Sequence, residues 1–147
     1  MDNAMKITDF LVCDDIRHEI GGKMTLVGIY NDFVILKEKQ DVKLPMTFRL
    51  GIYARIKMEN SEETIPDAFD FEFSQGDNHG VAVSKCKIMI KDNPSSFALT
   101  VMFGNFPIKS EEKVKFKIRF YKSDVQLCEL EPDYTMNVNI RDNVKKS

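Results

Sequence analysis

Strict alternation of apolar and polar residues is the feature that most constrains how this chain folds. In F-D-F-E-F-S, at 69–74, three phenylalanines alternate with polar residues, and in K-V-K-F-K-I-R-F, at 113–120, cations alternate with apolar residues. The runs at 48–56 and 97–103 have the same pattern. Successive side chains of a strand point to opposite faces, so this pattern is typical of antiparallel strands with one face on a core and the other in solvent.

Turn residues separate these runs at short intervals. Gly21-Gly22, Leu44-Pro45 and Q-G-D-N-H-G at 75–80 are examples, because glycine and proline favour turns. Ser123-Asp124 is another, because such residues tolerate positive φ or bond to their own backbone. The predicted strands lie at 6–19, 23–36, 47–57, 67–74, 81–91, 96–105, 113–122, 125–131 and 135–141. Many short strands indicate an all-β fold, and we expect an antiparallel β-sandwich of about eight strands with Greek-key connections of the immunoglobulin-like or C2-like kind. A barrel with a ligand cavity is the alternative.

The composition is that of a globular protein, and it limits the range of partners. A chain of 147 residues fits one domain, which we place at 1–142, followed by a polar tail at 143–147. With 21 basic and 23 acidic residues the net charge is −2, so no global field attracts nucleic acid or anionic lipid. Three scattered cysteines indicate a reducing compartment, and neither a signal peptide nor a membrane-spanning run is visible. We therefore predict a cytoplasmic protein.

The densest polar cluster is C-D-D-I-R-H-E-I-G-G-K, from Cys13 to Lys23. A helix over 14–20 would have fewer than two turns, which is marginal without tertiary support. Gly21-Gly22, in contrast, is a two-residue turn of the kind that hairpins prefer, because both glycines accept positive φ. The cluster therefore predicts the first hairpin of the fold.

The register of this hairpin decides which residues share a face. A two-residue turn pairs Ile16 with Val27 and places Asp15 beside Gly28, where the missing side chain leaves space. Alternation then puts Cys13 and Ile16 on opposite faces of their strand.

A candidate interaction patch follows from the same reasoning, made of Asp15, Arg17 and Lys23. Asp15 and Arg17 lie two residues apart and share a face, so we expect an ion pair there. An exposed pair contributes little to stability, so its first explanation is hairpin folding and its second is contact with a partner.

Metal binding has only weak support. Two histidines and three separated cysteines do not form the four-ligand set that zinc requires. Calcium prefers loops rich in oxygen ligands, but acids and amides also begin turns through their own hydrogen bonds, and no D-x-D-x-D spacing is present. The weak calcium candidates are Asp14, Asp77, Asn78, Asp92 and Asn93. We predict no cofactor.

Catalytic motifs are also missing from the sequence, which contains no G-x-S-x-G elbow and no phosphate-binding glycine loop. Cys86 is expected on the apolar side of its strand, where a thiol is buried and inert. Cys13 precedes two acids, which would raise the pKa of its thiol. We therefore predict a protein that is not an enzyme. A hydrolase that uses Cys13 or His18 is a third hypothesis.

Nucleic-acid binding would need the cations to line one solvent-facing sheet. Those concerned are Lys85, Lys87, Lys113, Lys115, Lys117, Arg119, Arg49 and Arg55, with Tyr53 and Tyr121 near them. The negative net charge argues against such binding, and amphipathic strands explain the lysines equally well.

The start of the chain carries a recognisable series of motifs. An apolar strand runs into C-D-D-I-R, and a Gly-Lys turn and L-V-G-I-Y at 26–30 follow. With Leu44-Pro45, this series resembles a family of small bacterial proteins of unknown function. The resemblance covers about the first third of the chain. It implies a single-domain β-sandwich of bacterial or phage origin, and it implies no activity, cofactor or catalytic residue.

The sequence thus favours a non-catalytic protein-binding or assembly module that uses a sheet face, an edge strand or loop ends. A protein partner is expected, and self-association is compatible with the pattern. The alternative is a calcium- or small-ligand-binding sandwich that uses the acids and amides at its loop ends.

Overall fold

The computed structural model describes residues 5–31, 33–38, 45–59, 65–76, 78–79, 83–88 and 95–142, and the regular structure in these residues is entirely β. The strands are β1 (Met5–His18), β2 (Met24–Tyr30), β3 (Phe33–Glu38), β4 (Met46–Met58), β5 (Ala68–Gln75), β6 (Asn78–His79), β7 (Val83–Lys87), β8 (Ser96–Ile108), β9 (Val114–Lys122), β10 (Val125–Leu130) and β11 (Asn137–Asp142). The described residues contain no helix long and apolar enough to cross a membrane.

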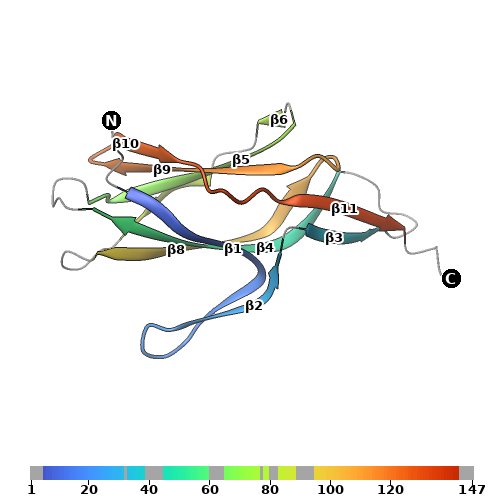
Figure 1. Cartoon of the computed structure of the whole chain (residues 1–147), viewed down its shortest axis with the longest axis horizontal. Coiled ribbons are helices and arrows are strands. Elements are labelled where there is room, and N and C mark those ends of the chain that lie inside the picture. Colours follow the sequence, from blue (N-terminus) through green and yellow to red (C-terminus); the bar gives the residue numbers. More distant parts are fainter. Residues whose placement is uncertain are drawn as a thin grey trace.

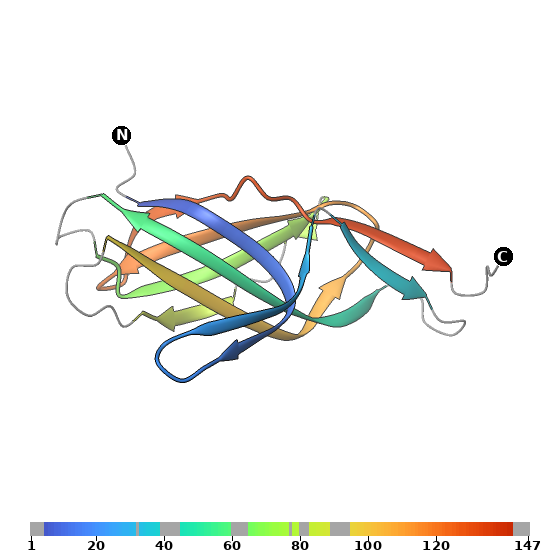
Figure 2. The same cartoon turned by 60° about the horizontal axis from the view of Figure 1, so that its bottom comes forward.

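Two antiparallel sheets form the body of the molecule (Figures 1 and 2). The first sheet has the order β2-β1-β4-β8, and the second has the order β10-β9-β5, with β6 and β7 both pairing with β5. No described strand of one sheet pairs with a strand of the other, so the sheets do not close into a barrel. The predicted antiparallel sandwich is confirmed, and the barrel is excluded.

Phenylalanines packed between the sheets make up much of the core. Phe71 is 1% exposed and Phe116 3%, and their ring centroids lie 5.7 Å apart. The ring of Phe106, on the first sheet, packs against the ring of Phe73, on the second, with 4.5 Å between the ring centroids. Burying one such side chain contributes about 1.5–3 kcal/mol, so this layer is the main stabilising element of the fold. The apolar residues of the runs at 69–74 and 113–120 therefore face the core, as the sequence predicts.

Local turn chemistry is also confirmed at the end of β9. Ser123 and Asp124 have φ values of 48° and 66°, and they join β9 to β10 as a two-residue turn. Positive φ at both residues matches the twist of the flanking strands.

The stretch 23–36, predicted as one strand, is divided. β2 ends at Tyr30 and β3 begins at Phe33, and β3 pairs in parallel with β11, about a hundred residues away in the chain. This two-stranded pair extends beyond the end of the two sheets in both views (Figures 1 and 2). Parallel pairing between distant segments leaves no local signal in the sequence, which is why the prediction missed it.

Gln75 ties the end of β5 to the loop between β8 and β9. It is 5% exposed, and its amide nitrogen donates to the carbonyl oxygens of Ser110 (2.6 Å) and Glu112 (2.8 Å). Its amide oxygen accepts hydrogen bonds from the backbone N–H groups of Lys109 (3.0 Å) and Ser110 (3.3 Å). The turn that the sequence predicted at 75–80 is confirmed, because Gln75 pairs with Asn78 and Gly76, between β5 and the short β6, has a φ of 59°.

Replacing Gln75 tests this connection. Gln75→Leu removes all four hydrogen bonds and leaves the loop's polar groups unpaired, so we expect the free energy of unfolding to fall by about 2–3 kcal/mol. Urea titration measures the loss. The matched control is Gln126→Leu at an exposed position of β10, expected to change stability by less than about 0.5 kcal/mol. Equal losses in the two variants would contradict the role assigned to Gln75.

Candidate functional site

The polar cluster at 13–23 lies in the β1–β2 hairpin, as predicted, but its turn is longer than expected. The backbone N–H of Glu19 donates to the carbonyl of Lys23 at 2.8 Å, which leaves three residues, Ile20, Gly21 and Gly22, in the loop. Both glycines have positive φ, of 85° and 76°. Glycine at these positions is therefore required by backbone conformation.

The predicted register is wrong by one residue. Ile16 pairs with Leu26 and not with Val27. A three-residue loop shifts the pairing by one position relative to a two-residue loop. Each residue of β1 therefore lies opposite a different residue of β2.

The residue beside Gly28 is therefore Asp14 and not Asp15. Gly28 has a φ of 66°, and a Cβ built on it would lie 2.3 Å from Oδ2 of Asp14. The hydroxyl of Tyr30 donates a hydrogen bond to Oδ1 of the same carboxylate. Burial, and then the hydrogen bond to Asp14, raise the pKa of Tyr30 above its ordinary value. Asp14 is held in place by its neighbours at the base of the hairpin.

Beyond this base, the hairpin leaves the sandwich as an arm, defined here as residues 14–29. β1 pairs with β4 only as far as Cys13, and from Asp15 to His18 its described ladder partner is β2 alone. Figures 1 and 2 both show the arm extending away from the two sheets. At its tip the Ile20 side chain is 96% exposed.

A small apolar contact anchors the arm to the outer face of the first sheet. Cys13 and Ile16 are both buried, and a Cβ built on Gly51 would lie 3.1 Å from Sγ of Cys13 and 3.1 Å from Cγ1 of Ile16. The two side chains therefore lie together, and the prediction that they face opposite ways is wrong. The strict alternation is interrupted between them, at Asp14, where Gly28 adopts its positive φ.

The charged part of the candidate patch is centred on Asp15. Its Oδ1 lies 2.8 Å from Nη2 of Arg49, and its Oδ2 lies 3.7 Å from Nε of Arg17. The hydrogen bond from Arg49 is the main reason why the pKa of Asp15 falls below its usual range. The expected pair with Arg17 is present, whereas Arg49 comes from β4 and no local pattern indicated it.

Lys23, the third predicted member, lies at the tip of the arm beside Glu19. It is four residues along β2 from Val27, the ladder partner of Asp15. At about 3.3 Å per residue this is a separation of roughly 13 Å along the strand. The structure therefore divides the candidate patch into a basal charge cluster and an exposed tip.

The thiol of Cys13 is unsuited to nucleophilic chemistry. Its single S–H is within donating distance of two carbonyl oxygens, those of Asp15 (3.4 Å) and Gly51 (3.6 Å). Burial is the main cause that raises its pKa, and the charges of Asp14 and Asp15 add to this. A reactive cysteine needs the opposite environment, exposed and close to cations.

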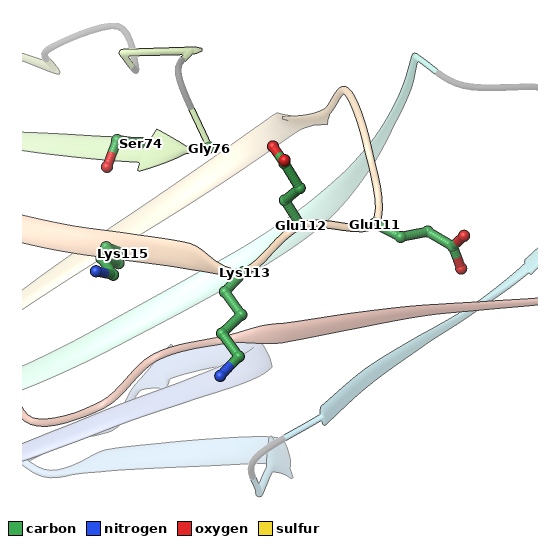
Figure 3. Close-up of a pocket in the computed structure, with 6 residues that line it drawn as sticks. All are labelled: Ser74, Gly76, Glu111, Glu112, Lys113 and Lys115. Atoms are coloured by element: carbon green, nitrogen blue, oxygen red, sulfur yellow. The ribbon is translucent and has the colours of Figure 1, made fainter.

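A second region to consider is a hollow of about 480 Å³ at the end of the second sheet, shown in Figure 3. It is lined by Ser74, Gly76, Glu111, Glu112, Lys113 and Lys115. Glu112 extends toward Gly76, whereas Glu111 and Lys113 extend in other directions. Because its charged groups diverge and are of both signs, the hollow offers no focused binding site.

The cations considered for nucleic-acid binding are divided between the two sheets. Arg49 and Arg55 lie on β4 of the first sheet, and Lys117 and Arg119 on β9 of the second. Arg119 is paired with Asp70 at 2.8 Å and with Glu72 at 3.0 Å, and Lys117 with Glu129 at 3.2 Å. On the second sheet, Lys117 and Arg119 are thus balanced by carboxylates, which reduces the positive charge that phosphates would meet there.

Among the residues that the structure describes, no group of three or more His, Cys, Asp or Glu side chains is placed to hold a metal ion. Of the calcium candidates, Asp77, Asp92 and Asn93 lie outside the described residues, as does the side chain of Asn78. Asp14 is described, and one of its carboxylate oxygens accepts the Tyr30 hydroxyl.

Comparison with known proteins adds no assignment: the chain matches no model of a protein family and no curated protein. The geometry of the chain itself must therefore carry any functional proposal.

The titration of Asp15 tests the charge cluster. A carboxyl whose pKa is lowered in the folded state stabilises the fold above its unfolded pKa of about 3.9, and this contribution is lost as the pH falls through the folded value. We expect NMR titration to show a pKa below the normal value in the wild type and a clear rise in Arg49→Gln. Arg17→Gln, which removes the weaker partner, serves as the control. An equal rise in both variants would contradict the dominant role of Arg49.

Substitution of Gly28 tests the base of the arm. In Gly28→Ala the new methyl group meets Asp14 and the backbone keeps a φ unfavourable for alanine, so we expect a loss of about 2–3 kcal/mol in unfolding free energy. Gly104→Ala is the matched control, because a Cβ there meets nothing within 4 Å. Unchanged stability of Gly28→Ala by chemical denaturation would show that the base tolerates a side chain.

Proposed function

We propose that the protein is a non-catalytic binding or assembly module and that the arm is the element that engages its protein partner. One observation carries the proposal: Ile20, a large apolar side chain, is 96% exposed at the tip of a hairpin whose described ladder contacts are confined to its own two strands. Single exposed apolar residues are common, but this one is presented on a projecting loop. A partner that covers Ile20 gains about 1.5–3 kcal/mol from that side chain alone.

The construction of the arm supports the proposal. At its base, the Asp14–Tyr30 hydrogen bond joins β1 to β2, and the Asp15–Arg49 pair joins β1 to β4. A binding element that is held in place before association loses less conformational entropy when it binds. The interaction patch predicted from sequence thereby acquires two parts, with Asp15 and Arg17 as the support and Lys23 at the contacting tip.

The absence of catalysis is part of the same proposal. Cys13 is buried with a raised pKa, and the side chains of the hollow do not converge. We also place the protein in the cytoplasm, since Cys13, Cys86 and Cys128 form no disulfide. The resemblance of its first third to small bacterial β proteins is consistent with this proposal and adds no activity to it.

The alternative of a calcium- or small-ligand-binding sandwich stays a prediction. Three of its candidate residues are outside the described part of the chain, and Asp14 already accepts a hydrogen bond. No feature of the described residues favours it over the arm.

Capture experiments with two matched variants test the arm. Ile20→Ser removes the exposed side chain of the tip, whereas Val125→Ser removes an equally apolar side chain, 65% exposed, from β10. We expect a partner captured by the wild type and by Val125→Ser to bind Ile20→Ser about tenfold or more weakly, because the apolar contact is lost. Thermal unfolding verifies that all three proteins are folded. Equal binding by both variants, or no partner for the wild type, would overturn the proposal.

A further inference from the structure

β8 is the least protected edge of the sandwich. It forms one end of the first sheet, and its 13 residues, S-F-A-L-T-V-M-F-G-N-F-P-I, include no charged residue. One side of β8 pairs with β4 along its length, and no described strand pairs with the other side. Unpaired backbone groups on such an edge are ready to pair with another strand.

The other edge strands have the features that discourage such pairing. β7 contains Lys85 and Lys87, and β10 contains Glu129 and a register shift against β9. β2 has only seven residues and is distorted at Gly28, which has positive φ. Charges, short length and irregular backbone all protect edges, and β8 lacks them from Ser96 to Phe103.

Two core-facing residues of β8, on either side of the buried Leu99, are also incompletely covered. Phe97 and Val101 are partly buried, although Ile56 and Ile52, their ladder partners on β4, are 0% and 1% exposed. The difference follows from position, because a strand at the edge of a sheet has a neighbour on one side only. A further strand beside β8 would cover the exposed flanks of these side chains.

We propose that two copies of this chain pair antiparallel through β8, around a two-fold axis beside Thr100. Thr100 then lies opposite Thr100 of the second copy, and Leu99 opposite Val101 of the second copy. Two residues further out, Phe97 meets Phe103 of the second copy. Opposite residues of an antiparallel pair share a face, so each apolar residue of the core side meets another apolar residue.

The sequence of β8 favours a second copy as the occupant. The strand matches itself in length and face pattern, and it carries no charge that would repel its copy. The net charge of −2 adds little long-range repulsion between copies. Pairing around a two-fold axis joins the β8 edge of one copy to the β8 edge of the other. The assembly therefore closes as a dimer, with no free β8 edge for further growth. The proposal involves β8 alone, so it does not depend on the function proposed for the arm.

Charge complementation at Thr100 tests the dimer. In Thr100→Lys two lysines face each other across the axis, and in Thr100→Glu two glutamates do so, so each variant alone should be monomeric with a dissociation constant raised about tenfold or more. An equimolar mixture of the two variants places a lysine opposite a glutamate and should restore the dimer. Gln126→Lys, at an exposed position of the edge strand β10 in the second sheet, is the matched control and should dimerise like the wild type.

Sedimentation of the full chain over a range of micromolar concentrations measures the outcome, with the 17.0 kDa monomer as reference. The expected result is a dimer for the wild type, for Gln126→Lys and for the mixture, and a monomer for each Thr100 variant alone. Hydrogen exchange adds an independent readout, since amides of residues 96–103 should exchange faster in the single Thr100 variants while those of β1 and β9 do not change. A monomeric wild type, or a dimer that persists in both single variants, would overturn the proposal.

Discussion

Burial of the alternating aromatic residues between the two sheets is the interaction on which the rest of the structure depends. The apolar faces of β5 and β9 can leave water only against the inner face of the first sheet, and contacts such as Phe71–Phe103 and Phe73–Phe106 cross this boundary. The polar residues between the phenylalanines are then directed outward. The network of Asp70, Glu72 and Arg119 on the outer face of the second sheet is therefore a consequence of core packing. It needs no ligand to explain it.

The arm shows how a projecting element can be held without a core of its own. Two strands alone are marginally stable, so the arm depends on its base, where Ile16 packs beside Cys13 over Gly51. Next to this contact, the positive φ of Gly28, against which Asp14 lies, changes the direction of the hairpin strands. The polar residues that look most like an active site in the sequence thus have a structural explanation. The exposed surface of the arm is at Ile20, outside the charge cluster.

The two proposed surfaces belong to different strands of the first sheet. The arm is formed by β1 and β2, and the free edge belongs to β8. Pairing of two copies through β8 would continue the first sheet across the dimer and give each dimer two arms. A divalent arrangement of this kind strengthens attachment to a repeating partner, because the second contact becomes intramolecular.

The sequence by itself determined those features that depend on neighbouring residues. Alternation at 69–74 and 113–120 predicted strands with one buried face, the Ser123-Asp124 turn was predicted from residues that tolerate positive φ, and the two-residue spacing of Asp15 and Arg17 predicted their ion pair. Only the tertiary structure decided the rest. Arg49 reaches Asp15 from β4, and β3 pairs with β11 from the far end of the chain. One additional residue in the Gly-Gly loop moved Asp14 into the position predicted for Asp15. Local propensity cannot specify such contacts, because loop length and long-range pairing decide which strands become neighbours and in which register they meet.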